Sequence, residues 1–105
     1  MSIKNPMHPG EFLLEVFMKP YGITCEEMAR NLGVSPSTIS RITSKKMDLT
    51  AGMALRLSIV VGREPESWMS MQSNYSLRQF INNDKAELSS LRPMKFEAAF
   101  DNEAE

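Results

Sequence analysis

The sequence is poor in the residues that build disulfides, metal sites and histidine-dependent catalytic centres. Its 105 residues include one cysteine and one histidine. A single cysteine cannot close an internal disulfide, and together with one histidine it supplies too few ligands for an ordinary zinc site. Paired carboxylates and phosphate-binding loop motifs are missing as well. We therefore expect no metal, no cofactor and no enzymatic activity.

The sequence also lacks a long apolar run. No segment has the length and hydrophobicity of a signal peptide or a membrane-spanning helix, so we expect a cytoplasmic protein without membrane contact. A chain of 105 residues has room for one domain with a modest core. The nine methionines are dispersed, which favours adaptable core packing over metal binding.

What the sequence does contain is helical periodicity. Apolar residues recur at helical spacing in residues 10–18, 24–32, 35–44, 50–61 and 65–83, and no alternating run indicates a hairpin. In the first of these segments, one broad apolar face is formed by Phe12, Leu13, Val16 and Phe17. The pattern predicts an all-α fold, a compact five-helix bundle. We expect a domain over residues 1–90 and a flexible, irregular acidic tail over residues 91–105, where Pro93 discourages a helix.

Residues 24–46 carry the strongest local signals. Thr24 and Glu27 have the spacing of a capping box at a helix start. Gly33 suits a left-handed helix end, and Ser35 followed by Pro36 is typical of the first residues of the next helix. These signals predict two short helices joined by a tight turn, a helix-turn-helix.

The second of these helices has a polar outer face. With Val34, Ile39 and Ile42 assigned to the core, the remaining side chains are hydroxylic or basic. Such a helix can enter the major groove, where an arginine can bind a guanine edge and lysines can bind phosphates. We predict DNA contacts from Ser35, Pro36, Ser37, Thr38, Ser40, Arg41, Ser44, Lys45 and Lys46. The alternative is a helical hairpin that only packs, with its serines solvated.

Charge is unevenly distributed along the chain, although the whole carries only −1. Residues 28–63 hold six basic residues against one acidic residue, and residues 84–105 hold three basic against six acidic. A basic middle with an acidic tail fits a small DNA-binding protein that also meets a second, basic partner. The alternative for the tail is a solvated, disordered end.

The last helical segment has more apolar surface than one small bundle needs. One stripe contains Trp68, Met71 and Tyr75, and a second, displaced around the axis, contains Leu77, Phe80 and Ile81. We predict that these six residues form a homodimer contact, because a two-fold protein would offer two helices to two DNA half-sites. The alternative is that Trp68 and Met71 complete the monomer core while the later residues pack under the tail.

Three segments together resemble the HigA-type antitoxins, a branch of the lambda-repressor-like helix-turn-helix family. They are MHPGEFLLEVFMKPYGIT, MARNLGVSPSTISRI and LTAGMALRLSIVVGREPESWMSMQSNYSL, and the resemblance runs from Met7 to about Arg78. It implies a homodimer that represses its own operon by binding double-stranded operator DNA at an inverted repeat. It also implies that the protein binds and silences a small mRNA-endonuclease toxin of the HigB type.

The chain departs from this family at three positions. Lys45 lies where a glycine would ease a left-handed turn, Met47 replaces a familiar basic residue, and Cys25 replaces a commonly polar residue. A phage-like transcriptional repressor without a toxin partner is the alternative function.

Overall fold

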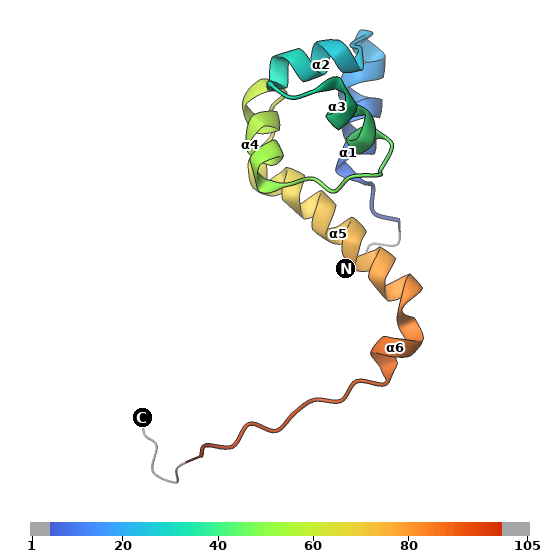
Figure 1. Cartoon of the computed structure of the whole chain (residues 1–105), viewed down its shortest axis with the longest axis vertical. Helices are drawn as coiled ribbons and strands as arrows, with labels where there is room; N and C mark the ends of the chain where they lie inside the picture. Colours follow the sequence, from blue (N-terminus) through green and yellow to red (C-terminus); the bar gives the residue numbers. More distant parts are fainter. Residues whose placement is uncertain (1–4, 100–105) are drawn as a thin grey trace.

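The structure is a computed structural model that describes residues 5–99, and these residues form helices joined by short loops, without a strand (Figure 1). The first helical segment is α1 (Pro9–Phe12), continued by a π-helical turn η1 (Leu13–Met18) and a 3-10 turn η2 (Lys19–Tyr21). It is followed by α2 (Cys25–Leu32), α3 (Pro36–Thr43), α4 (Ala51–Val60), α5 (Pro65–Asn83) and α6 (Lys85–Ser89). The predicted all-α fold is confirmed.

All five predicted helical segments are helical, and α6 is an addition. This last helix has five residues and follows α5 directly. Its N-cap residue, Asp84, is of a type that favours helix starts, although its side chain makes no capping hydrogen bond. In the other helices the predicted start signals are real. The side chains of Thr24 and Ser35 accept hydrogen bonds from the backbone N–H groups of Glu27 and Thr38, at 3.1 Å and 3.2 Å.

The π-helical turn changes which side of the first helix faces the core. The Lys19 N–H donates to the carbonyl of Leu14, five residues earlier, so the turn is wider than in an α-helix. Leu13 and Met18 are consequently both buried, whereas Val16 is 41% exposed. The predicted inward position of Val16 is therefore wrong, because the prediction assumed an ordinary α-helical period.

The core lies where the first helix, α2, α3, α4 and the start of α5 meet. Trp68 is its largest buried side chain, and its ring lies 5.7 Å from that of Phe12 and 6.2 Å from that of Phe17. The indole N–H donates to the carbonyl of Gly62 at 2.9 Å, so the one polar atom of this side chain is satisfied.

The molecule is compact only as far as the first half of α5. Beyond it, the end of α5, α6 and residues 91–99 project away from the domain, with residues 91–99 running extended (Figure 1). The radius of gyration is 19.3 Å, well above the value of about 13 Å for a compact chain of this length. The acidic residues of the predicted tail that follow residue 99, Asp101, Glu103 and Glu105, lie outside the described residues. Within residues 5–99, no helix is both long and apolar enough to cross a bilayer.

Candidate nucleic-acid interface

The outer face of α3 is the candidate interface. Ile39 and Ile42 are buried and anchor the helix, which packs against α1 and α2. Most of the predicted DNA-contacting positions are exposed on the opposite side and at the helix ends: Ser35, Pro36, Ser37, Ser40, Arg41, Ser44, Lys45 and Lys46. Thr38 is half-buried. The helix is thus presented outward with a hydroxylic and basic surface.

The hydroxyl groups at the start of α3 already have partners. The Ser35 Oγ accepts from the Thr38 N–H and lies 3.1 Å from the Ser37 Oγ and 2.9 Å from the Thr38 Oγ1. In contrast, the side chains of Ser40 and Arg41 make no hydrogen bond or ion pair within residues 5–99. Among the hydroxylic and basic side chains of α3 itself, these two are therefore the ones free to bind a ligand.

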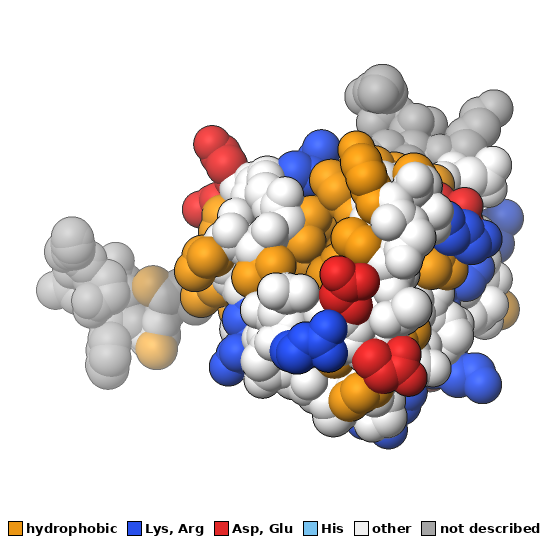
Figure 2. All heavy atoms as spheres, turned by 90° about the horizontal axis from the view of Figure 1, so that it is seen from above, with side chains coloured by type: hydrophobic (Ala, Val, Ile, Leu, Met, Phe, Trp, Pro, Cys, Tyr) orange, Lys and Arg blue, Asp and Glu red, His pale blue; other side chains and the backbone are white. Residues whose placement is uncertain are grey.

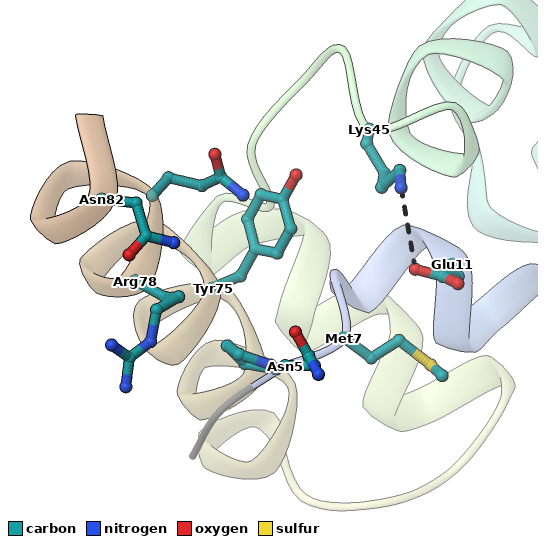
Figure 3. Close-up of a pocket in the computed structure, with 9 residues that line it drawn as sticks. Asn5, Met7, Glu11, Lys45, Tyr75, Arg78 and Asn82 are labelled. Carbon is teal, nitrogen blue, oxygen red and sulfur yellow. Dashed lines mark ion pairs between the residues drawn. The ribbon is translucent and has the colours of Figure 1, made fainter. Parts of the chain in front are cut away.

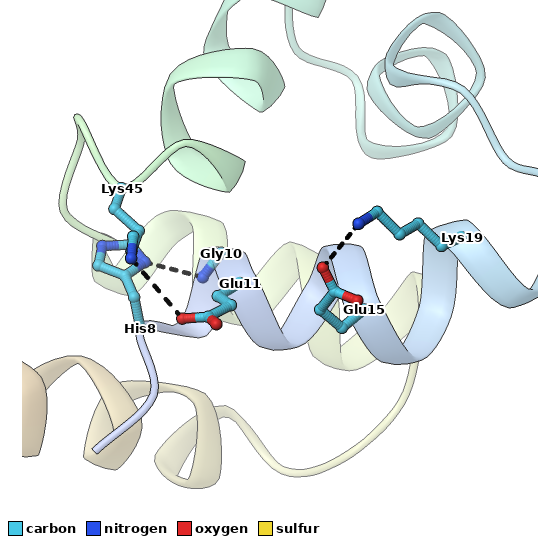
Figure 4. A network of polar contacts seen from close by, with 6 residues as sticks. All are labelled: His8, Gly10, Glu11, Glu15, Lys19 and Lys45. Carbon is cyan, nitrogen blue, oxygen red and sulfur yellow. Dashed lines mark hydrogen bonds and ion pairs between the residues drawn. The ribbon is translucent and has the colours of Figure 1, made fainter. Parts of the chain in front are cut away.

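Two lysines follow α3 in a strained turn. The φ angle of Lys45 is 67°, in the left-handed region that favours glycine, and the backbone N–H of Lys46 donates to the Arg41 carbonyl at 2.8 Å. The Lys45 Nζ lies 3.9 Å from a carboxylate oxygen of Glu11 (Figure 4). Both lysine side chains are exposed, so each can reach a phosphate while the turn holds their backbone.

A buried histidine caps the start of the first helix. The Nδ1 atom of His8, which is fully buried, accepts a hydrogen bond from the Gly10 N–H at 2.9 Å (Figure 4). The His8 ring meets that of Tyr75 edge to face, with centroids 4.9 Å apart. Burial lowers the pKa of His8, and the nearby carboxylate of Asp48 opposes that effect. Burial thus favours the neutral imidazole, whose Nδ1 atom caps the start of α1.

The connection from α3 to α4 is tied to α5 by one buried side chain. The Gln72 Oε1 accepts from the Leu49 N–H at 2.7 Å, and the Gln72 Nε2 donates to Asp48 at 3.3 Å and to Ser76 at 3.0 Å. All three bonds use the side-chain amide of Gln72, a residue that is only 6% exposed. α5 therefore fixes the position of the loop that leaves α3.

A side chain of α4 stabilises the turn between α2 and α3. The Arg56 Nη1 donates to the Leu32 carbonyl at 2.7 Å, which satisfies a backbone acceptor at the end of α2. Gly33 follows with a φ of 72°, as predicted. Arg56 and Gln72 lack a local sequence signal for these roles, because both bonds join residues 23 or 24 positions apart.

A polar cleft of about 320 Å³ opens beside Lys45 (Figure 3). Residues 5–7 and Glu11 line one side of it, and the α5 residues Tyr75, Arg78, Gln79 and Asn82 line the other. Two cationic side chains, Lys45 and Arg78, therefore belong to the lining of a single hollow next to the exit of α3.

The six residues predicted for a dimer contact divide into two groups. Trp68 is 0% exposed, so its predicted place in a dimer contact is wrong: a side chain without accessible surface cannot touch a partner. Met71 and Tyr75 are half-buried and face the protomer's own core and His8. The other three are exposed on the opposite side of α5, at 58% for Leu77, 63% for Phe80 and 43% for Ile81.

The chain matches known proteins along most of its length. A family model described as Helix-turn-helix matches residues 14–68, just over half of the chain. The Virulence-associated protein I of Dichelobacter nodosus is 38% identical over 98 residues, which cover 90% of each chain. Antitoxin HigA-1 of Vibrio cholerae is 31% identical over 91 residues, covering 87% of this chain and 86% of that protein.

A solved structure supports the same relationship in three dimensions. The antitoxin GraA in complex with its operator superposes with a TM-score of 0.79 at 34% identity, covering 91% of this chain and 97% of that one.

Proposed function

Because the chain belongs to the helix-turn-helix family and, within it, to the HigA-type antitoxins, we propose that it binds operator DNA as a homodimer and neutralises a toxin of the HigB type. The observation that carries the DNA-binding part is the exposed face of α3, where Ser40 and Arg41 lack partners among the described residues. The operator-bound state of the similar antitoxin GraA supports it.

In this proposal α3 enters the major groove. Arg41 binds a guanine through its O6 and N7 atoms, Ser37, Ser40 and Ser44 reach base edges or phosphates, and Lys45 and Lys46 bind phosphates. Ser35 and Thr38 play a smaller part, because their hydroxyl groups hold the start of the helix. Pro36, at the first position of α3, contributes shape rather than hydrogen bonds.

The dimer forms through the exposed side of α5. Leu77, Phe80 and Ile81 present apolar surface on a helix that projects from the domain, and an isologous contact would bury the same stripe of both copies. The two α3 helices would then face two half-sites of an inverted repeat, about 34 Å apart. Phe80→Asp should give monomers in sedimentation, whereas Gln79→Asp, on the opposite side of α5, should leave dimers.

Neutralisation of the toxin is a binding function, and we assign no catalytic residue. The partner would be a small mRNA endonuclease. Because the operator DNA and the mRNA cut by the toxin would both lie in the cytoplasm, the protein would act there too. The runner-up function is a phage-like repressor of the same fold without a toxin partner. The two functions differ in one observable, which is the presence of a second protein in the complex.

The test is co-expression with the reading frame next to the gene, followed by purification and a gel shift with the upstream DNA. An antitoxin should co-purify with the neighbouring product, restore growth of cells that express it, and shift the DNA with and without it. A DNA shift without any toxic neighbour would favour the plain repressor. Loss of the DNA shift would overturn the proposed use of α3.

A further inference from the structure

An apolar cleft lies at the end of the molecule that carries α2. It has a volume of about 300 Å³ and is lined by Phe17, Tyr21, Ile23, Met28, Val60 and Val61, together with Glu27 and Asn31 of α2. Tyr21 is 72% exposed, and Ile59, next to Val60 in α4, is 83% exposed. Figure 2 looks onto this end and shows hydrophobic side chains gathered in the middle of the face, with charged side chains beside them. The proposed DNA contact and dimer contact leave this cleft without an occupant.

One acidic residue lines the cleft. It is Glu27, which is exposed and belongs to the first turn of α2. An occupant that fits should carry apolar side chains for the cleft and positive charge for this carboxylate.

Residues 91–96 have that composition. Leu91, Met94 and Phe96 are 67%, 72% and 87% exposed, and Arg92 and Lys95 lie between them in the sequence. The segment is extended, and these three apolar side chains are almost uncovered by their own chain. The chain therefore contains both an apolar cleft lined by one carboxylate and an apolar segment with basic residues.

The segment cannot reach the cleft of its own chain. The cleft and the tail lie at opposite ends of the molecule, whose longest dimension is 64 Å (Figure 1). Turning back, the tail would have to pass all 19 residues of α5, about 28 Å, and then the domain. The nine described residues 91–99 span at most about 30 Å when fully extended. A second copy is needed.

We infer that residues 91–96 of one copy dock in the apolar cleft of a second copy. This inference rests on the proposed homodimer, in which the exposed stripe of α5 turns the projecting end of each chain toward its partner. Met94 and Phe96 would fill the cleft, and Arg92 and Lys95 would lie near the carboxylate of Glu27. The two tails would clasp the two domains symmetrically, so each copy would be both donor and acceptor.

Disulfide trapping tests this directly. In a Cys25→Ser background, which removes the native cysteine, Tyr21→Cys combined with Phe96→Cys should give a covalent dimer under mild oxidation. Ser37→Cys combined with Phe96→Cys is the control, because Ser37 lies on the DNA-facing side of α3, and it should give little. Equal trapping of the two pairs, or a disulfide within one chain, would overturn the inference.

A second measurement uses the full chain without the introduced cysteines. Met94→Asp combined with Phe96→Asp should raise the dimer dissociation constant by about tenfold or more, since two apolar side chains lose their contact. Ala98→Asp adds a charge to the same tail and should change the constant little. An unchanged constant for the double variant would contradict the docking.

These outcomes separate the inference from the proposed function. A dimer that binds operator but does not trap Tyr21 with Phe96 would overturn the docking alone. A chain that sediments as a monomer would overturn both. If Tyr21→Asp instead abolishes co-purification of the neighbouring toxin while the dimer and its constant persist, the cleft belongs to the toxin and the inference is wrong.

Discussion

Gly10 lies so close to Ile42 that a methyl group at residue 10 would overlap the Ile42 carbonyl oxygen and lie 2.5 Å from the carbonyl carbon. Ile42 belongs to the last turn of α3, so the start of the first helix supports the end of the DNA-facing helix through a backbone contact. Only a residue without a side chain permits it.

The first prediction concerns this contact. Gly10→Ala should destabilise the protein by about 2 kcal/mol or more, lowering Tm by roughly 10 °C in calorimetry, because backbone must shift to admit the methyl group. Gly52→Ala is the matched control: in the first turn of α4, the new Cβ would meet only Thr50 Oγ1, at 4.0 Å. The control should be neutral or stabilised by about 0.5 kcal/mol. Equal Tm values for the two variants would contradict the packing.

The second prediction concerns Gln72. Gln72→Met should cost about 1–3 kcal/mol, because the buried Leu49 N–H loses its acceptor while the volume changes little. Thermal unfolding measures this cost. Gln79→Met removes an exposed amide from the same helix and should leave Tm within about 2 °C of the parent value. A comparable Tm loss in both variants would argue against the buried hydrogen bond.

The third prediction concerns Arg41. Arg41→Ala should weaken operator binding by roughly 5- to 150-fold, which corresponds to about 1–3 kcal/mol, and relax the preference for one base pair. A gel shift with the operator and with single-base variants measures both effects. Arg30→Ala, on α2, should change affinity for all sequences by the same factor. An unaltered sequence preference in the Arg41 variant would show that Arg41 does not recognise a base.

Lys45 is the subject of the fourth prediction. Lys45→Gly should raise stability by about 0.5–1 kcal/mol, because glycine adopts the left-handed φ of 67° without strain. The same change should weaken DNA binding and reduce the salt dependence by about one phosphate contact. Lys46→Gly should show the loss of binding without the gain in Tm, since Lys46 has no positive φ. A lower Tm for Lys45→Gly would show that its side chain stabilises the turn.

The fifth prediction is a pH dependence through His8, the only histidine. Its pKa in the folded chain is lowered from 6.5, so the unfolded chain takes up a proton first as pH falls. This contribution to stability is complete above about pH 6.5 and is lost as pH falls toward the lowered folded pKa. Protonation would also end the hydrogen bond from Gly10 to the Nδ1 atom.

The measurement is the free energy of unfolding between pH 7 and pH 5.5. His8→Asn keeps a side chain that can cap the helix but removes the titration, so its stability should vary less with pH over this interval. An equally steep slope in the variant would assign the pH dependence to other groups.

Local signals in the sequence predict the helices well. Thr24, Gly33 and Ser35 act within a few residues, so their capping and turn roles can be read from the order of residues alone. The exposed positions of α3 follow from the same spacing, because Ile39 and Ile42 define the buried side. Whether the exposed residues contact DNA stays a prediction.

What the sequence does not predict depends on contacts between distant segments. The π-helical turn that moves Val16 outward has no local signature, and neither do the bonds from Arg56 to Leu32 and from Gln72 to Leu49. Trp68 is misassigned to a dimer contact because helical periodicity finds an apolar stripe but cannot say which protomer covers it. The sequence also does not predict that the end of α5 projects from the domain, because this depends on where the core ends.

α5 is one unbroken helix, and its two halves hold different things. Near its start, Gln72 holds the loop that leaves α3, and further along, Phe80 lies in the stripe proposed to join two copies. In such a dimer, each α5 would be a rigid connection between the dimer contact and the α3 of its own copy. The distance between the two α3 helices would then depend on the angle at which the two α5 helices cross. Residues far from the DNA-facing surface would therefore determine the spacing of half-sites in the operator.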